Sequence, residues 1–432
     1  MFVSESALGN VALVATSDNV TDRNVHPTQV NALIAKRYIM CCRFLWSAVC
    51  AITALSLGQG VADDSDGFTP LFNEKDLAGW VLVNTPQDTW TVKDGMLVCS
   101  GKPVGEIRTQ KMYQNFILEV EWRHMVPRGN AGIFVWADDI TAKGVPFHRS
   151  IEVQVLENSY GQSQHHTTHG DIFPIHGATL TPVNGRGGGR AFPTEERSLP
   201  SPQWNHYRIE CRDGTISLAV NHKVVTQATD ATPRKGYICL ESEGGVVHYR
   251  NLRIQELPET LVAPEHVAVA NRGFVSLYSG LDLRGWNVAE AEKEHWHVND
   301  WVLAFDGKTA SGSTAFVTTE SFASPMFVLD LRPMDGFVSL SIGDGSFEKS
   351  IVISTADTAW KPLLEKRDWI RLETSVRENL LTLSANGNPI VTNLPLPNKA
   401  VPLSLKISGP AELANIYGIP KEVNNRVTDG LE

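Results

Sequence analysis

The sequence predicts an all-β protein made of two tandem β-sandwich domains, the second of which is degenerate. Three observations predict this fold. Short runs alternate apolar and polar residues, Gly, Asn, Asp and Pro separate these runs, and a segment that begins at Gly67 returns at Gly273. Helical 3.6-residue periodicity is nearly absent. Repeated half-buried strands between turns are typical of β-sandwiches and jelly rolls.

The internal repeat indicates a duplicated domain. Residues 67–80, GFTPLFNEKDLAGW, return as residues 273–286, GFVSLYSGLDLRGW, with seven of the fourteen positions identical. A long period of this kind indicates duplicated domains rather than a solenoid. The second copy lacks a His-rich loop and the acidic strand residues of the first. We therefore expect any chemistry to lie in the first copy.

The first 62 residues are expected to lie outside the fold. Lys36, Arg37 and Arg43 precede an apolar stretch at 44–57, and Gly-Val-Ala at 60–62 resembles a cleavage site, as in a secretory signal. Met40 is the more plausible start, and the protein is expected to be secreted or periplasmic. The expected organisation is 1–39 a start-site artefact, 40–62 a signal peptide, 63–258 the first sandwich, 259–272 a linker, 273–420 the second sandwich and 421–432 a tail.

Composition excludes several classes of protein. Thirty-eight basic against forty-eight acidic residues give a net charge of −10, which disfavours a nucleic-acid partner. Beyond residue 62 no long apolar run predicts a membrane span. Cys99, Cys211 and Cys239 remain after removal of the signal. Their odd number and wide spacing predict neither a disulfide framework nor a zinc site, and leave three buried thiols or one bridge.

Three predicted strands carry acids or amides on the face opposite their apolar residues. Since side chains alternate along a strand, the runs at 116–123, 151–155 and 238–243 each separate a core face from a polar face. The polar positions are Glu119, Glu121 and Arg123, then Glu152 and Gln154, then Glu241 and Glu243. Like charges side by side destabilise a sheet unless something binds them, so these acids favour a sugar or a divalent cation. The alternative is a solvated outer face.

A long loop follows the second of these strands. Residues 157–190 show no clear strand pattern and contain several histidines, and loops of this length are commonly functional. His169 and Asp171 stand two residues apart, a pair that suits a base or a metal ligand, or a hydrogen bond that braces the loop. The glycine-rich stretch at 184–190 lacks the features of a phosphate-binding loop.

The chain resembles the 3-keto-disaccharide hydrolase domain family over residues 67–258. The resemblance is carried by the opening Gly-Phe-Thr-Pro-Leu-Phe-Asn motif, NAGIF at 130–134, IEVQVL at 151–156, QWN at 203–205 and YRNLRI at 249–254. It implies a concanavalin A-like jelly roll, secretion, and a sugar site on the concave sheet. It also implies an enzyme that acts on glycosides oxidised at C3.

The resemblance implies elimination across C1 and C2 of the sugar, followed by hydration. A 3-keto group acidifies the C2 proton, which a base removes while a cation or fixed donors stabilise the enediolate. Glu152 or His169 is the expected base. The expected cation ligands, for an ion of unknown identity, are Glu121, Asp171 and Glu243, and the expected sugar-binding residues are Arg123, Asn130, Gln154, Glu119 and Glu241.

Two alternatives stay open. Glu152 and Glu157 resemble the carboxylate pair of laminarinase-like retaining glycosidases, if a bulge brings Glu157 to the face of Glu152. A non-catalytic carbohydrate-binding or surface module would suit the eleven tryptophans, although most lie at repeat-equivalent positions that suit a core. Convergence of the acidic side chains on one point would favour an enzyme.

Overall fold

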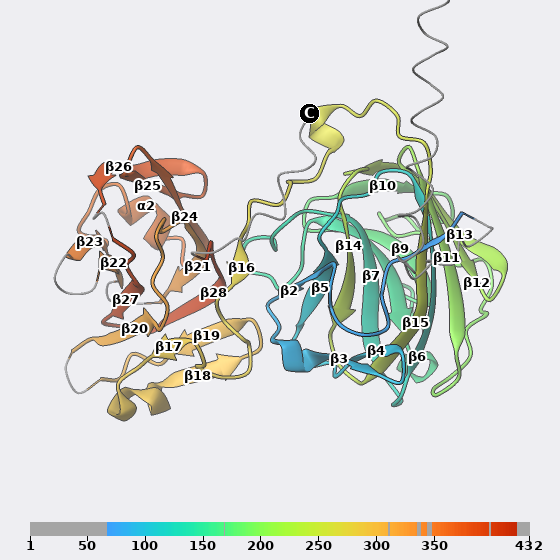
Figure 1. Ribbon diagram of the computed structural model, residues 1–432, viewed down its shortest axis with the longest axis horizontal. Coiled ribbons are helices and arrows are strands. Elements are labelled where there is room, and N and C mark those ends of the chain that lie inside the picture. The colour runs from blue at the N-terminus through green and yellow to red at the C-terminus, as the bar shows by residue number, and fades with distance from the viewer. Residues whose placement is uncertain are drawn as a thin grey trace, which may run out of the picture. The chain divides into compact units, whose positions relative to one another are not determined.

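The computed structural model describes residues 67–167, 169–309, 312–334, 338–343, 348–396 and 399–420 (Figure 1). The predicted start-site artefact at 1–39, the signal peptide at 40–62 and the tail at 421–432 lie outside the described residues. The described part is built from strands, with one α-helix, α2 (Lys361–Leu364), and a few 3-10 turns. The all-β prediction is confirmed.

Two antiparallel sheets form the first sandwich. The larger sheet has the strand order β10-β13-β12-β11-β6-β15-β4-β3, with β1 paired to β15, and the second sheet has the order β2-β5-β14-β7-β8-β9. The bounds in the larger sheet are β1 Thr69–Pro70, β3 Trp90–Lys93, β4 Met96–Cys99, β6 Phe116–His124, β10 Thr179–Pro182, β11 Asn205–Arg212, β12 Thr215–Val220, β13 Lys223–Thr232 and β15 Val247–Glu256. Those in the six-stranded sheet are β2 Trp80–Val83, β5 Gly105–Thr109, β7 Asn130–Ala137, β8 Ser150–Leu156, β9 His169–Ile175 and β14 Tyr237–Ser242. The 3-10 turns η1 (Gln87–Thr89) and η2 (Asn158–Tyr160) lie between strands.

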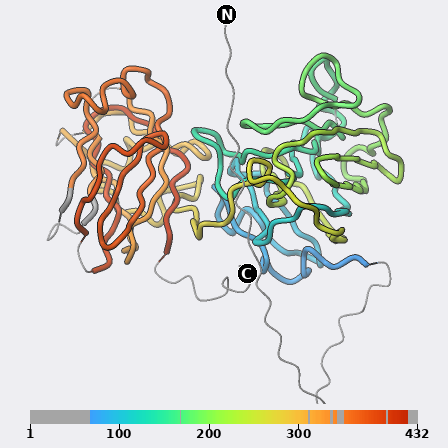
Figure 2. Tube along the Cα trace, turned by 90° about the horizontal axis from the view of Figure 1, so that it is seen from above, coloured from blue at the N-terminus to red at the C-terminus, as the bar shows by residue number. Residues whose placement is uncertain are grey.

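Two further antiparallel sheets form the second sandwich. Their orders are β18-β19-β28-β21-β24-β25-β26, with β16 paired to β28, and β17-β20-β27-β22-β23. The bounds are β16 Val275–Ser276, β17 Trp286–Asn287, β18 Trp296–Asn299, β19 Val302–Phe305, β20 Thr314–Thr318, β21 Phe327–Pro333, β22 Val338–Gly343, β23 Glu348–Ile353, β24 Ile370–Arg377, β25 Leu380–Ala385, β26 Asn388–Pro395, β27 Leu403–Ile407 and β28 Ala411–Gly418. The turns η3 (Pro264–His266) and η4 (Glu290–His295) complete the elements. Among the described strands no sheet is shared by the two sandwiches. Figure 2 traces the same chain as a tube coloured from blue at the N-terminus to red at the C-terminus.

Each sandwich has its own hydrophobic core. In the first, Leu118 and Val120 of β6 pack in one cluster with Ile151 and Val153 of β8. These strands belong to different sheets, so the two sheets face each other across the core. The apolar residues predicted by the alternation therefore lie in the core, and the polar residues between them lie on the outer face of the sheet to which their strand belongs.

The three cysteines of the described chain are free and buried, as the thiol alternative predicted: Cys99, Cys211 and Cys239. Burial raises the pKa of the Cys99 thiol to about 11. No helix among the described residues is long and apolar enough to cross a membrane.

Candidate functional site

The outer face of the six-stranded sheet carries a cluster of carboxylates. Here β5, β14, β7 and β8 lie side by side in that order. Glu106 of β5 stands directly opposite Glu241 of β14, and Phe134 of β7 stands opposite Glu152 of β8. The residues that alternate with them, such as Leu240 of β14, lie in the core. Three acids from three strands therefore share one face.

Two of these carboxylates converge above a glycine. A Cβ atom on Gly132 of β7 would lie 3.0 Å from Glu152 Oε1 and 3.0 Å from Glu241 Oε2. Both side chains are buried, with 7% of Glu152 and 1% of Glu241 exposed. The Oε2 atom of Glu241 has no hydrogen-bond partner among the described residues. The absence of a side chain at Gly132 is what lets the two carboxylates approach one point.

The buried acids oppose one another's ionisation. Burial and the Glu243 carboxylate raise the pKa of Glu152 well above its ordinary value, against the effect of the Arg190 guanidinium. Burial and the charges of Glu152 and Glu243 likewise raise the pKa of Glu241. Carboxyls coupled in this way release their protons in separate steps, so one can be ionised while its neighbour is protonated.

Amides stand at the edge of the cluster. Asn130 Nδ2 donates to the carboxylate of Glu243, which is exposed at the rim of the sheet. Gln154 Nε2 in turn donates to Asn130 Oδ1 at 3.1 Å. Asn130, Gln154, Glu152, Glu241 and Glu243 are thus the predicted site residues that the structure brings together.

Asp171 lies near this cluster but its oxygens are occupied. It accepts bonds from the Thr167 backbone N–H at 3.0 Å, from the Thr167 hydroxyl, and from Arg190 Nη1 at 2.8 Å. The Arg190 guanidinium also lies 3.4 Å from the ring centroid of Phe173. Sequence reasoning missed Arg190, which stood only as the end of a glycine-rich stretch. The positive charge of Arg190 acts to lower the pKa of Glu152.

His169 braces a loop. Its Nε2 atom accepts the backbone N–H groups of Arg197 at 3.3 Å and Ser198 at 3.2 Å, and its Nδ1 atom lies 2.5 Å from Ser198 Oγ. Burial lowers the pKa of this imidazole to about 4. A neutral ring held on these contacts favours the loop-bracing interpretation over the role of base.

Glu157 does not join Glu152. Its carboxylate accepts the backbone N–H groups of Arg128 at 2.8 Å, Ser159 at 2.9 Å and Ser201 at 3.2 Å. The strand β8 pairs with β7 from Ile151 to Leu156 without a register shift, so no bulge in this pairing returns Glu157 to the face of Glu152. The laminarinase-like alternative, which required such a bulge, is therefore wrong in its geometry.

Three other predicted residues lie on the opposite face of the sandwich. Glu119, Glu121 and Arg123 belong to β6 in the larger sheet, so they cannot converge with Glu152. Alternation assigns a residue to an outer face but does not say which of two sheets holds its strand. The expectation that all these acids form one common site is therefore wrong, because Glu119 and Glu121 lie on the larger sheet and Glu152 lies on the six-stranded sheet.

Arginines balance the acids of that opposite face. Glu119 accepts bonds at 2.7 Å from Arg208 and from Arg253, and it lines a groove of about 420 Å³. Glu121 accepts a bond at 2.7 Å from Arg250. Arg123 stacks 4.4 Å from the centroid of Trp204. This face is a network of ion pairs, in contrast to the acids around Gly132, whose pKa values are raised by burial and by one another.

Comparison with known proteins finds a family model that matches the part of the chain that holds the cluster. Residues 67–255 match the family model of the 3-keto-alpha-glucoside-1,2-lyase-like domain. The predicted resemblance is confirmed for the first sandwich. The matched span contains all the carboxylates around Gly132, and the match supports a carbohydrate-active function for this domain.

Solved structures give more distant likenesses. A candidate glycosyl hydrolase from Parabacteroides distasonis ATCC 8503 is 22% identical, with 45% of this chain and 95% of that chain covered and a TM-score of 0.36. The carbohydrate-binding module CBM66 from Bacillus subtilis is 13% identical, with 41% and 96% covered and a TM-score of 0.31. The β-glucanase of Bacillus licheniformis is also 13% identical, with 44% and 97% covered and a TM-score of 0.30. No curated protein matches the chain in sequence.

Gly132→Ala is expected to inactivate the site while leaving the protein folded. The new methyl group would meet Phe134 Cε1 at 2.9 Å and the two carboxylates at 3.0 Å, so these side-chain ends must move apart. Displacements of about 1 Å in a catalytic constellation can lower turnover about 10²-fold. Gly188→Ala is the matched control, since a Cβ there meets nothing within 4 Å. Equal kcat/KM values of the two variants for a 3-keto-glucoside would contradict a role of the Glu152 and Glu241 carboxylates in turnover.

Proposed function

We propose that the first sandwich cleaves 3-keto-glycosides by elimination followed by hydration, with the carboxylates above Gly132 as its acid–base machinery. The observation that carries the proposal is the approach of Glu152 Oε1 and Glu241 Oε2 to one point on a face that also offers amide groups. The matched family model supports the substrate class.

The coupled carboxyls suit the two proton transfers of an elimination. The ionised form of Glu152 takes the C2 proton, which the neighbouring ketone acidifies. The C1–oxygen bond then breaks, and a protonated carboxyl at Glu241 gives its proton to the departing oxygen. Water adds to the resulting double bond to give the 3-keto sugar. A base is most effective when its pKa lies near the working pH, and the raised pKa of Glu152 moves it in that direction.

A divalent cation fits the oxygen-rich part of the same face. The Glu243 carboxylate lies at the rim of the sheet beside Asn130, and hard cations prefer carboxylate and amide oxygens. Glu243 would hold the ion, with Asn130 at its edge. When bound, such an ion supplies a positive charge that stabilises an enediolate. Of the three ligands expected from the sequence, only Glu243 keeps that role, because Glu121 lies on the other sheet and the oxygens of Asp171 are occupied.

The proposal places the protein outside the cytoplasm, in the periplasm or the medium. The basic and apolar stretches before residue 62 and the small-residue motif at 60–62 support secretion. The partner is then a glycoside whose C3 hydroxyl has already been oxidised, so an oxidoreductase must supply the substrate.

Turnover of a 3-keto-glucoside tests the proposal. Protein stripped with a chelator is incubated with 3-keto-trehalose or a 3-keto-glucoside, with and without Mg²⁺, Mn²⁺ or Ca²⁺, and the release of 3-keto-glucose is followed. The expected result is release of 3-keto-glucose that Glu152→Gln lowers by about 10²–10⁴-fold. If no product formed under any condition and unoxidised glycans raised the melting temperature, the protein would be a carbohydrate-binding module and not an enzyme. Turnover of the unoxidised glycoside would indicate an ordinary glycosidase.

A further inference from the structure

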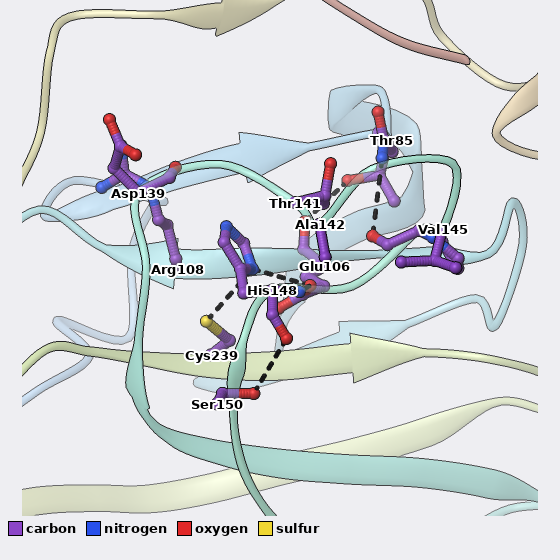
Figure 3. Close-up of polar contacts among 12 residues, drawn as sticks. Thr85, Glu106, Arg108, Asp139, Thr141, Ala142, Val145, His148, Ser150 and Cys239 are labelled. Carbon is purple, nitrogen blue, oxygen red and sulfur yellow. Dashed lines mark hydrogen bonds and ion pairs between the residues drawn. The ribbon is translucent and has the colours of Figure 1, made fainter. Parts of the chain in front are cut away.

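A second cluster of ionisable groups is buried at another position of the six-stranded sheet. It consists of Glu106 on β5, Cys239 on β14 and His148 in the segment before β8 (Figure 3). His148 Nδ1 lies 2.7 Å from Glu106 Oε1 and 3.8 Å from Cys239 Sγ. One donor atom from each residue lies within 4.8 Å of the other two, and all three side chains are fully buried. The mechanism proposed above uses none of them.

The protein alone leaves this cluster unsatisfied. Glu106 Oε2 is buried and has no hydrogen-bond partner among the described residues. Buried polar atoms without a partner are rare in folded proteins and destabilise them. Glu241, itself buried, stands directly opposite Glu106, which adds a second acid beside the cluster.

Arg108, the arginine paired in register with Cys239, is engaged elsewhere. Arg108 stands opposite Cys239 in the register of β5 and β14. Its guanidinium donates to the backbone oxygens of Asp139 and Thr109 and lies 4.5 Å from the ring centroid of Tyr237. Among the described ion pairs Glu106 therefore has His148 as its partner and no arginine, whereas Glu119 on the opposite face pairs with Arg208 and Arg253.

The spacing of the donor atoms is close to that of a tetrahedral metal site. Zinc bonds of about 2.0–2.3 Å at tetrahedral angles separate nitrogen and sulfur ligands by about 3.5 Å, and nitrogen and oxygen ligands by about 3.4 Å. The observed nitrogen–sulfur distance of 3.8 Å is near the first value. The nitrogen–oxygen distance of 2.7 Å is that of a hydrogen bond, which must open by about 0.7 Å to admit an ion.

We propose that Glu106, His148 and Cys239 bind one Zn²⁺ ion, which cross-links β5, β14 and the segment that leads into β8. A thiolate, an imidazole and a carboxylate are the donors that zinc prefers, whereas Mg²⁺ and Ca²⁺ require oxygen ligands. On binding, the ion displaces the thiol proton of Cys239 and the proton shared by His148 and Glu106, and both leave to solvent. Three protein ligands leave a fourth position for water or a further donor.

The ion would anchor the segment before β8 to the sheet. The His148 backbone N–H also donates to Glu106 Oε1 at 3.0 Å, so the segment before β8 is already anchored at this carboxylate. A zinc ion at the same place would strengthen that anchor. The cysteine spacing in the sequence predicts no zinc site, because only one of the three ligands is a cysteine.

Cobalt substitution tests the site without any measurement of turnover. Metal-free protein, kept reduced, is titrated with Co²⁺ and its absorption spectrum recorded. We expect one Co²⁺ ion per chain, with a near-ultraviolet thiolate-to-cobalt band, and displacement of that band by Zn²⁺. Zinc is also expected to raise the melting temperature by several degrees. An ion held by the carboxylates around Gly132 would give no thiolate band, so the result does not depend on the proposed reaction.

Matched cysteine variants assign the band. Cys239→Ala should abolish it, and Cys211→Ala, which removes another buried thiol on β11, should retain it. Absence of a thiolate band in the unaltered protein, or its persistence in Cys239→Ala, would overturn the proposal. The first of these outcomes needs no variant, so a failure of Cys239→Ala to fold leaves the test intact.

Discussion

Glu152→Gln is expected to lower kcat/KM for a 3-keto-glucoside by about 10²–10⁴-fold, the usual contribution of a general base. The substitution keeps the size of a side chain that is 93% buried, but it cannot accept the C2 proton. Because the change removes a charge from an acidic cluster, the fold should survive. Steady-state kinetics and a thermal melt on the same preparation measure both effects.

Glu210→Gln is the matched control for this loss of activity. Glu210 lies on β11 in the larger sheet and pairs at the surface with Arg212, at 3.2 Å between Oε1 and Nη2. Its substitution should leave kcat/KM within experimental error. If Glu152→Gln retained full turnover, Glu152 would not be the base and the proposed mechanism would fall.

Glu241→Gln is expected to stabilise the protein at neutral and alkaline pH. The folded-state pKa of Glu241 is raised well above the ordinary value of 4.5, first by burial and then by Glu152 and Glu243. The folded protein therefore binds this proton more tightly than the unfolded chain does. The contribution of Glu241 to the free energy of unfolding is complete below about pH 4.5 and is lost as the pH rises from there through the raised pKa.

Urea unfolding across a pH series measures this effect. At pH 8 the free energy of unfolding of Glu241→Gln should exceed that of the parent by about 1–3 kcal/mol, the usual penalty of an unsatisfied buried polar group. The difference should shrink toward pH 4. The control Glu119→Gln should destabilise instead, because hydrogen bonds from Arg253 and Arg208 outweigh burial and lower the pKa of Glu119. A lower free energy of unfolding for Glu241→Gln at pH 8 would show that its carboxylate is satisfied.

The fold could be predicted because its signals are local. Alternation along β6 and β8 distinguishes the core residues from the outward polar ones, and the structure places Leu118 and Val153 in the core as expected. The order of strands within a sheet depends on pairings between distant segments. The pattern within one strand contains no information about those pairings.

The site could be predicted only in part for the same reason. Glu152, Gln154, Glu241 and Glu243 share a face because β8 and β14 belong to one sheet, whereas Glu119 has the same alternation on the other sheet. The roles of His169 and Glu157 depend on loop backbone N–H groups that no spacing rule locates. Arg190 and Glu106 reach the cluster only through the tertiary fold.

The three unbridged thiols bear on how this protein can be made. The described residues contain no cystine, so their folding does not depend on oxidation, and this part of the chain should tolerate strong reductants and heterologous expression in a reducing bacterial host. Because the sulfur atoms are also shielded from solvent, alkylating reagents should modify them only after denaturation, which makes thiol labelling a convenient reporter of unfolding.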